Sequence, residues 1–118
     1  MSGPVLRFGA FELDLARQAL RADGRPIDLE PLTARLLSYL ASNRSRVVPS
    51  DELLDEIWSG VAVSEAALHQ ALRQARRALG DDGKRQACIR TVRGEGYRFV
   101  AAASVAGASG AGSGGEGA

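Results

Sequence analysis

The chain has 118 residues, of which 45% are hydrophobic and 25% are charged, the composition of an ordinary globular protein with room for one domain. This composition excludes wholesale disorder, and no apolar run approaches the roughly 18 residues that a membrane span needs. The start of the chain lacks the basic region and the apolar block of a signal peptide, so we expect a cytoplasmic protein.

Positive charge is concentrated in the second half of the chain. Residues 1–63 hold seven basic and nine acidic side chains, whereas residues 64–98 hold eight basic and four acidic ones. A local positive field favours a polyanionic partner, although a single basic segment is equally often a solvated surface. The charge pattern alone therefore leaves both interpretations open.

The first part of the chain predicts a small antiparallel sheet over residues 5–29. Phe11, Leu13 and Leu15 alternate with acidic residues, which is the period of a half-buried strand. Asp23-Gly24 predicts a hairpin turn, because both central residues of a type I′ turn need positive φ.

Two helices are predicted in the middle of the chain. The first begins at Pro31, which suits the first turn of a helix, and carries leucines at helical spacing until Asn43. In the second, Ser50 is the predicted N-cap, and acidic residues follow where the helix dipole favours negative charge. This acidic run could be imagined as a metal site, but helix capping and a solvated face explain it better: Asp51, Glu52, Asp55 and Glu56.

The third predicted helix begins after Ser64 and ends at Gly80, and its two faces differ in chemistry. A helix advances by about 100° per residue, so one apolar stripe faces the core: Leu68, Leu72, Ala75 and Leu79. The opposite side carries Ala66, Gln70, Arg73, Gln74 and Arg77. Glutamine can pair with adenine and arginine with guanine, while alanine lets the helix approach the groove. A solvated helix face is the plainer alternative.

A β-hairpin is predicted at the end of the folded region, around the turn Arg93-Gly94-Glu95-Gly96. Arg90, Arg93 and Arg98 surround this turn, so the hairpin is predicted to project basic side chains toward a minor groove or phosphates. A helix with this outer face followed by a basic hairpin indicates DNA binding more specifically than either part.

The segment from Arg90 to Phe99 closely resembles the terminal hairpin of OmpR/PhoB-type winged-helix regulators. Residues 53–58 and 72–81 look like that family's second and third helices, and the resemblance covers about residues 5–101. It implies an α+β winged helix-turn-helix with an N-terminal four-stranded antiparallel sheet, three helices and a C-terminal β-hairpin wing. The implied function is sequence-specific binding of double-stranded DNA in a bacterial transcriptional regulator, of two-component or one-component type, with the third helix in the major groove.

The family's DNA contacts and the outer face of the third helix together give the predicted DNA-binding residues. They are Trp58, Ala67, Gln70, Arg73, Gln74, Arg76, Arg77, Thr91 and Arg93. Trp58 would contact a phosphate ahead of the third helix, but it could equally be a core residue. Alanine at 66, 67 and 71 replaces larger residues frequent in the family, so the target sequence does not transfer.

The resemblance also implies partners and an arrangement of domains. Double-stranded DNA is expected to be bound head-to-tail on direct repeats by a domain that is monomeric or weakly associating on its own, and RNA polymerase is a further candidate partner. A winged helix at residues 1–101 followed by a flexible linker or tail at 102–118, rich in Ala, Gly and Ser, is similar to the ToxR/CadC-like arrangement, in which the DNA-binding domain comes first.

The sequence offers no set of residues for catalysis. It has no Ser/His/Asp set and no phosphate-cradling glycine loop, so we expect no cofactor and no small-molecule substrate. With one histidine and one cysteine it cannot form a cysteine/histidine metal site, so we expect no metal. Cys88 is interpreted as a small core residue, and His69 as a phosphate contact or a solvated side chain. The rival hypothesis is a winged helix used as a protein-interaction module, which would more often show apolar side chains on the outer face.

Overall fold

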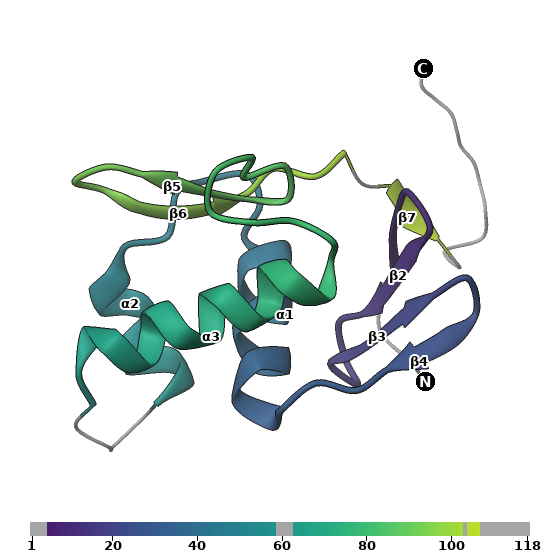
Figure 1. Ribbon diagram of the computed structural model, residues 1–118, viewed down its shortest axis with the longest axis horizontal. Helices are drawn as coiled ribbons and strands as arrows, with labels where there is room; N and C mark the ends of the chain where they lie inside the picture. The colour runs from purple at the N-terminus through teal and green to yellow at the C-terminus, as the bar shows by residue number, and fades with distance from the viewer. Residues whose placement is uncertain (1–4, 59–62, 103, 107–118) are drawn as a thin grey trace.

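The computed structural model describes residues 5–58, 63–102 and 104–106, and it has the predicted α+β architecture (Figure 1). The N-terminal strands are β1 (Val5–Phe8), β2 (Phe11–Asp14), β3 (Ala19–Ala22) and β4 (Arg25–Ile27). The helices are α1 (Pro31–Ser42), α2 (Ser50–Ile57) and α3 (Glu65–Ala78), and the hairpin consists of β5 (Ile89–Val92) and β6 (Gly96–Phe99). The winged helix-turn-helix predicted from the sequence is confirmed.

The N-terminal strands form an antiparallel meander, and a strand from the end of the chain joins its open edge. The order of strands is β4-β3-β2-β1-β7, where β7 spans Ser104–Ala106. Asp23 and Gly24, between β3 and β4, have φ values of 53° and 80°, so the predicted turn with two positive φ angles is confirmed.

The prediction of a linker over residues 102–118 is wrong for the residues of β7. In this strand Val105 is the register partner of Leu6, and Ala106 is the partner of Val5. The Ala-, Gly- and Ser-rich composition gave no hydrophobic signal, but an edge strand is held by backbone hydrogen bonds that need none. Residues 103 and 107–118 of that prediction lie outside the described part of the chain.

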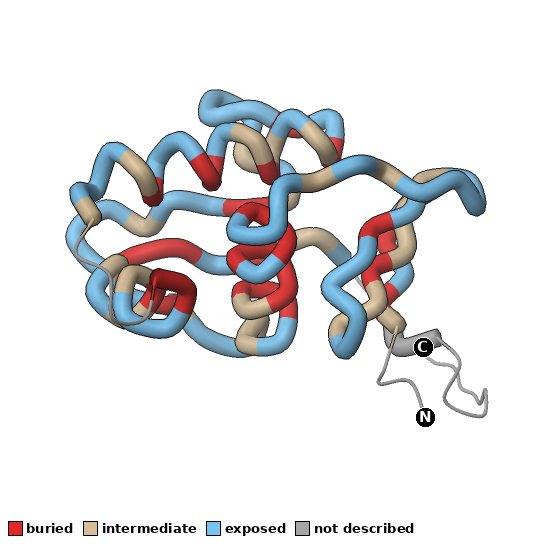
Figure 2. The backbone as a smooth tube through the Cα atoms, turned by 90° about the horizontal axis from the view of Figure 1, so that it is seen from below, coloured by how far each residue is buried: buried red, intermediate tan, exposed pale blue. Residues whose placement is uncertain are grey.

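The core lies between the N-terminal sheet, the three helices and the hairpin. Figure 2 shows the buried positions gathered around α1, in the middle of the molecule. Leu36, Leu37 and Leu40 of this helix are fully buried. At the sheet, the ring of Phe8 meets the ring of Phe99 edge to face at 5.2 Å between centroids, so β1 packs directly against the end of the wing.

The helix ends follow the sequence closely, with one correction. Pro31 is the first residue of α1, and Gly80 after α3 has a φ of 70°, as a glycine that ends a helix requires. The predicted N-cap Ser50 is wrong: Pro49 is the N-cap of α2, because its carbonyl already accepts the first helical hydrogen bond, from Leu53 N at 3.1 Å. No helix in the described part of the chain is long and apolar enough to cross a membrane.

Candidate nucleic-acid interface

The helix α3 has one buried and one exposed face, in the predicted register. Its apolar stripe is buried: Leu68, Leu72, Ala75 and, at the C-cap, Leu79. On the opposite side Gln70, Arg73 and Arg77 are exposed, as are Ala66 and His69. Because α3 packs against both α1 and α2, its buried face fixes which side chains point to solvent.

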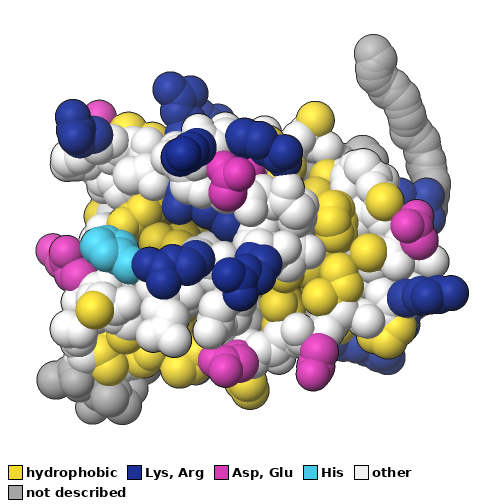
Figure 3. Space-filling view, in the orientation of Figure 1, with side chains coloured by type: hydrophobic (Ala, Val, Ile, Leu, Met, Phe, Trp, Pro, Cys, Tyr) yellow, Lys and Arg dark blue, Asp and Glu magenta, His cyan; other side chains and the backbone are white. Residues whose placement is uncertain are grey.

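The exposed side of α3 carries positive charge that no acidic group of the described residues neutralises by an ion pair. The three salt bridges of this part of the chain lie elsewhere, between Arg7 and Glu12, between Arg17 and Asp14, and between Arg46 and Glu52. Figure 3 shows Lys and Arg side chains gathered over α3 and the hairpin, with the histidine at the edge of this group. Such a face attracts a polyanion.

Two predicted contact residues lie at the flank of α3 rather than on its outer face. Gln74 is half-buried, and its Oε1 accepts a hydrogen bond of 2.7 Å from the hydroxyl of Thr33, a residue of α1 that is 1% exposed. Ala67 is half-buried and packs against the core cluster. The sequence interpretation that put Gln74 opposite the core is therefore wrong, because this side of α3 is covered by α1.

Two further predicted contacts, Arg76 and Thr91, are bonded to each other. The Arg76 guanidinium is half-buried and donates from Nη2 to Thr91 Oγ1 at 2.9 Å. Its Nε and Nη2 also donate to the carbonyl of Ile89, at 3.1 and 3.0 Å. These bonds join α3 to β5, so both side chains have partners within the protein.

Trp58 lies in the hydrophobic core cluster with 8% of its surface exposed. It follows α2 as the C-cap residue, and its backbone N–H donates to the carbonyl of Leu54 at 3.1 Å. Of the two roles weighed for this residue, the structure favours the core; a phosphate contact by its indole N–H stays a prediction.

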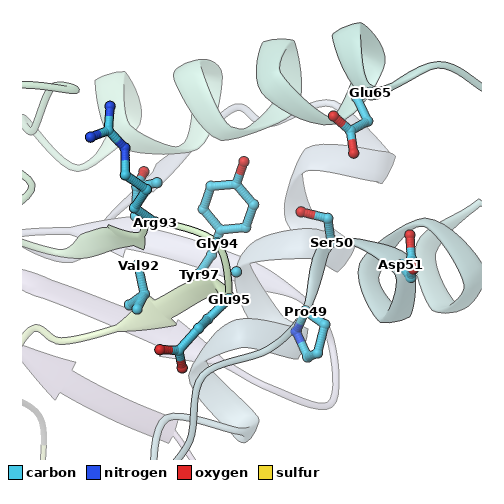
Figure 4. Close-up of a pocket in the computed structure, with 11 residues that line it drawn as sticks. Pro49, Ser50, Asp51, Glu65, Val92, Arg93, Gly94, Glu95 and Tyr97 are labelled. Carbon is cyan, nitrogen blue, oxygen red and sulfur yellow. The ribbon is translucent and has the colours of Figure 1, made fainter.

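The turn of the wing holds its arginine and its glutamate apart. Glu95 N donates to Val92 O at 2.9 Å, which closes the turn, and Gly94 has a φ of 77°. Arg93 is exposed and extends toward the side of α3, whereas Glu95 points the other way (Figure 4). A groove of about 560 Å³ separates this turn from the starts of α2 and α3.

The other hairpin arginines lie in the strands rather than in the turn. Arg90 and Arg98 are register partners in the strands β5 and β6, and both are exposed. Arg98 donates from Nε to the carbonyl of Arg44 at 3.0 Å. Of the three arginines predicted to surround the turn, Arg93 lies in it, and Arg90 and Arg98 lie on the two strands that lead to it.

Sequence reasoning missed the role of Gly96, which lets the wing approach the loop before α2. Val48 N donates to Tyr97 O at 2.7 Å and Tyr97 N donates to Val48 O at 2.9 Å, so Val48 pairs with β6. A Cβ on Gly96 would lie 2.1 Å from the Val48 carbonyl oxygen. The sequence predicts only a turn at this glycine, because Val48 lies about fifty positions earlier in the chain.

Asp81 also escaped sequence reasoning, although it is buried just after α3. Its carboxylate accepts hydrogen bonds from the N–H groups of Ala87 at 2.8 Å and Cys88 at 2.9 Å. Burial by itself would raise the pKa of Asp81, but these backbone hydrogen bonds outweigh it and hold the pKa below its ordinary value. The aspartate therefore stays charged and fixes the start of the wing.

The remaining reactive or acidic side chains have structural surroundings. Burial raises the pKa of the half-buried Cys88 thiol. Hydrogen bonds from Arg46 and Tyr39 lower the pKa of Glu52, in the acidic run of α2, to about 2. Within the described residues, no three His, Cys, Asp or Glu side chains are placed to hold a metal ion.

Comparison with known proteins finds a family model and relatives that match most of the chain. Residues 24–99 match the model of the family described as "Transcriptional regulatory protein, C terminal". The chain is 37% identical over 99 residues to the transcriptional regulatory protein KdpE of Mycobacterium tuberculosis, an alignment that covers 83% of this chain and 44% of KdpE. The chain thus spans less than half of the length of this relative.

Solved structures show the same fold. The DNA-binding domain of Escherichia coli CadC superposes with a TM-score of 0.72 at 26% identity, over 89% of this chain and 99% of that one. The Klebsiella pneumoniae RstA DNA-binding domain, solved in complex with the RstA box, has a TM-score of 0.68 at 25% identity, over 80% of this chain and 95% of that one.

Proposed function

The chain belongs to the OmpR/PhoB-type family of transcriptional regulatory C-terminal domains, which bind DNA, and from this premise we propose that α3 reads the major groove of double-stranded DNA while the wing touches the minor groove or the backbone. The observation that carries the proposal is that Gln70, Arg73 and Arg77 are exposed opposite the buried stripe of α3, with Arg93 extended to the same side. The proposal assigns the domain no reaction.

The side chains divide into two groups by what they can recognise. Gln70 and Arg73 would meet base edges, since their amide and guanidinium groups can pair with adenine and guanine in the major groove. Arg77 and Arg93 would meet phosphates, or in the case of Arg93 a narrow minor groove. Gln74 and Ala67, at the flank toward α1, would contribute at the rim of the contact.

The outer face of α3 is not the apolar surface that the rival hypothesis would more often show. The large hydrophobic side chains that stand out as exposed in the described part of the chain are Leu32, at 39%, and Val100, at 38%. Neither lies on the outer face of α3 or in the turn of the wing. This distribution supports a charged partner over a protein docked on α3.

Beyond a single site, we propose head-to-tail binding of two such domains on direct repeats. Each copy would act in the cytoplasm, where bacterial DNA lies, as the DNA-reading part of a regulator. RNA polymerase is a proposed further partner, through the loop between α2 and α3, of which residues 59–62 lie outside the described part.

The test begins with the selection of a preferred duplex from a random pool by the 118-residue chain. Gln70→Ala, Arg73→Ala and Arg93→Ala are then titrated on the selected and a scrambled duplex at several salt concentrations. We expect the first two to cost about 1–3 kcal/mol on the selected duplex only. If Arg93 contacts a phosphate, its loss should weaken both complexes and make the salt slope shallower by about one.

The matched control is Arg25→Ala, which removes one exposed positive charge from β4, in the N-terminal sheet. It should leave the preference between the two duplexes unchanged. Wild-type affinity in all three interface variants would reject α3 and the wing as the DNA-reading surface and favour the protein-docking alternative.

A further inference from the structure

We propose that Arg76 and Asp81 are positioning residues that hold the wing in place relative to α3. Arg76 donates hydrogen bonds to the backbone carbonyl of Ile89, and Asp81 accepts one from its backbone N–H. The inference rests on the proposed DNA-reading function of α3 and the wing. It assigns Arg76 a different role from the DNA contact that the family resemblance implied for it.

Arg76 binds the backbone carbonyl of Ile89. Two of its nitrogen atoms, Nε and Nη2, converge on the carbonyl oxygen of Ile89 at 3.1 and 3.0 Å, and Nη2 also reaches Thr91 Oγ1 at 2.9 Å. The planar guanidinium thus bonds two alternate residues of β5, the backbone of Ile89 and the side chain of Thr91. Such a fork fixes direction as well as distance.

Asp81 binds the backbone N–H of Ile89. Its Oδ2 accepts from Cys88 N at 2.9 Å and from Ile89 N at 3.4 Å, and its Oδ1 accepts from Ala87 N. The backbone N–H of Asp81 donates in turn to the carbonyl of Arg76 at 2.8 Å. The two residues that bind Ile89 are therefore joined to each other at the end of α3.

Because Ile89 is at the base of β5, its orientation determines where the turn of the wing lies. Arg93 is four residues beyond Ile89, which at about 3.3 Å per residue places the turn about 13 Å from Ile89. A rotation of the base of the strand by about 10° would move the tip by about 2 Å, enough to break a hydrogen bond to a phosphate. The hairpin has further anchors: the pairing of Tyr97 with Val48 and the hydrogen bond from Arg98 to Arg44 O hold β6, and Thr91 N donates to Gln86 Oε1 at 2.9 Å.

Arg76 is also turned from the residues with which α3 would read bases. At about 100° per residue it lies about 60° from Arg73 and about 120° from Gln70, toward β5. It is half-buried, whereas Arg77 and Arg73 are exposed. A direct phosphate contact and a positioning role predict different couplings to Arg93, which makes them separable.

The experiment is a pair of double-mutant cycles with the 118-residue chain on the selected duplex. In the wild-type background we expect Arg93→Ala to weaken binding about tenfold, as for loss of a charge-assisted hydrogen bond. In the Arg76→Ala background the same change should cost less than about twofold, because the tip is already misplaced. Gln70→Ala should cost the same factor in both backgrounds, since α3 itself is not moved.

The outcomes separate the inference from the proposed function. Equal losses for Arg93→Ala in both backgrounds, with a salt slope already made shallower by Arg76→Ala alone, would make Arg76 a direct phosphate contact and overturn the inference. No loss for Gln70→Ala or Arg93→Ala in the wild-type background would instead reject the proposed function.

Two milder variants keep the inference testable if Arg76→Ala does not fold. Thr91→Val removes only the side-chain acceptor of Arg76, and Arg76→Lys keeps the charge but loses the fork. Each should reduce the cost of Arg93→Ala from about tenfold toward about threefold while leaving the cost of Gln70→Ala unchanged. An undiminished cost of Arg93→Ala in both variants would overturn the positioning role.

Discussion

Replacement of Gly96 by alanine should be among the most destabilising changes in the wing. The added Cβ would lie 2.1 Å from the carbonyl oxygen and 2.7 Å from the carbonyl carbon of Val48, so the backbones have to separate. Separation breaks the two hydrogen bonds between Val48 and Tyr97, worth about 2 kcal/mol together. The φ of 146° at Gly96 adds a strain of about 1–3 kcal/mol. We expect a loss of about 3–5 kcal/mol, a large share of the stability of a small domain.

The measurement is urea denaturation followed by the fluorescence of Trp58, the only tryptophan of the chain and a buried one. Gly94→Ala is the matched control, because Gly94 also has a positive φ, 77°, but a Cβ there would meet nothing within 4 Å. This control should lose only about 1 kcal/mol. Equal losses for the two variants would refute the argument that close approach to Val48, rather than turn geometry, requires Gly96.

Three further predictions concern acidic groups and the end of the chain. The pKa of Asp81 is lowered in the folded state, so its contribution to stability is complete above about pH 4 and is lost as the pH falls through the lowered pKa. Asp81→Asn should therefore cost about 1–2 kcal/mol at pH 7 and flatten the acid limb of a urea stability profile; an unchanged acid limb would contradict this. The Glu52 carboxyl should titrate near pH 2 by NMR, and Tyr39→Phe should raise its pKa, though not to the ordinary value, because Arg46 remains; an unmoved titration would show that the Tyr39 hydroxyl is not a partner. Deletion of residues 104–118 should lower the unfolding free energy by about 1 kcal/mol through loss of β7, whereas deletion of 107–118 should not, and equal effects would reject a stabilising role for that strand.

The sequence predicts what depends on periodicity and on local backbone chemistry. The register of α3 follows from the spacing of Leu68 and Leu72, and the turn between β3 and β4 follows from Asp23-Gly24, because each signal lies within a few residues. The outer face of α3 could be predicted for the same reason. Gln70 and Arg73 are exposed because their neighbours at helical spacing are buried.

Features that depend on contacts between distant segments could not be predicted in this way. Gly96 is required by Val48, the exposure of Gln74 is limited by Thr33, and β7 is placed by the free edge of β1. None of these partners is close in sequence to the residue it constrains. The hydrophobic pattern is silent about them as well, since they involve backbone groups or polar side chains.

The three arginines of α3 show why residue type on a recognition helix does not decide a role. Arg73 and Arg77 are four residues apart, so they lie within about 40° of each other and share the exposed face. Arg76, one residue before Arg77, is turned by about 100° and finds the carbonyl of Ile89 instead of solvent. The sequence interpretation gave all three the same partner, DNA, because a motif or a helix face records that an arginine is present and not which backbone group it meets. The double-mutant cycles with Arg93 distinguish these roles, since a residue that contacts DNA adds its own term to the affinity, whereas a residue that positions the wing changes the term contributed by Arg93.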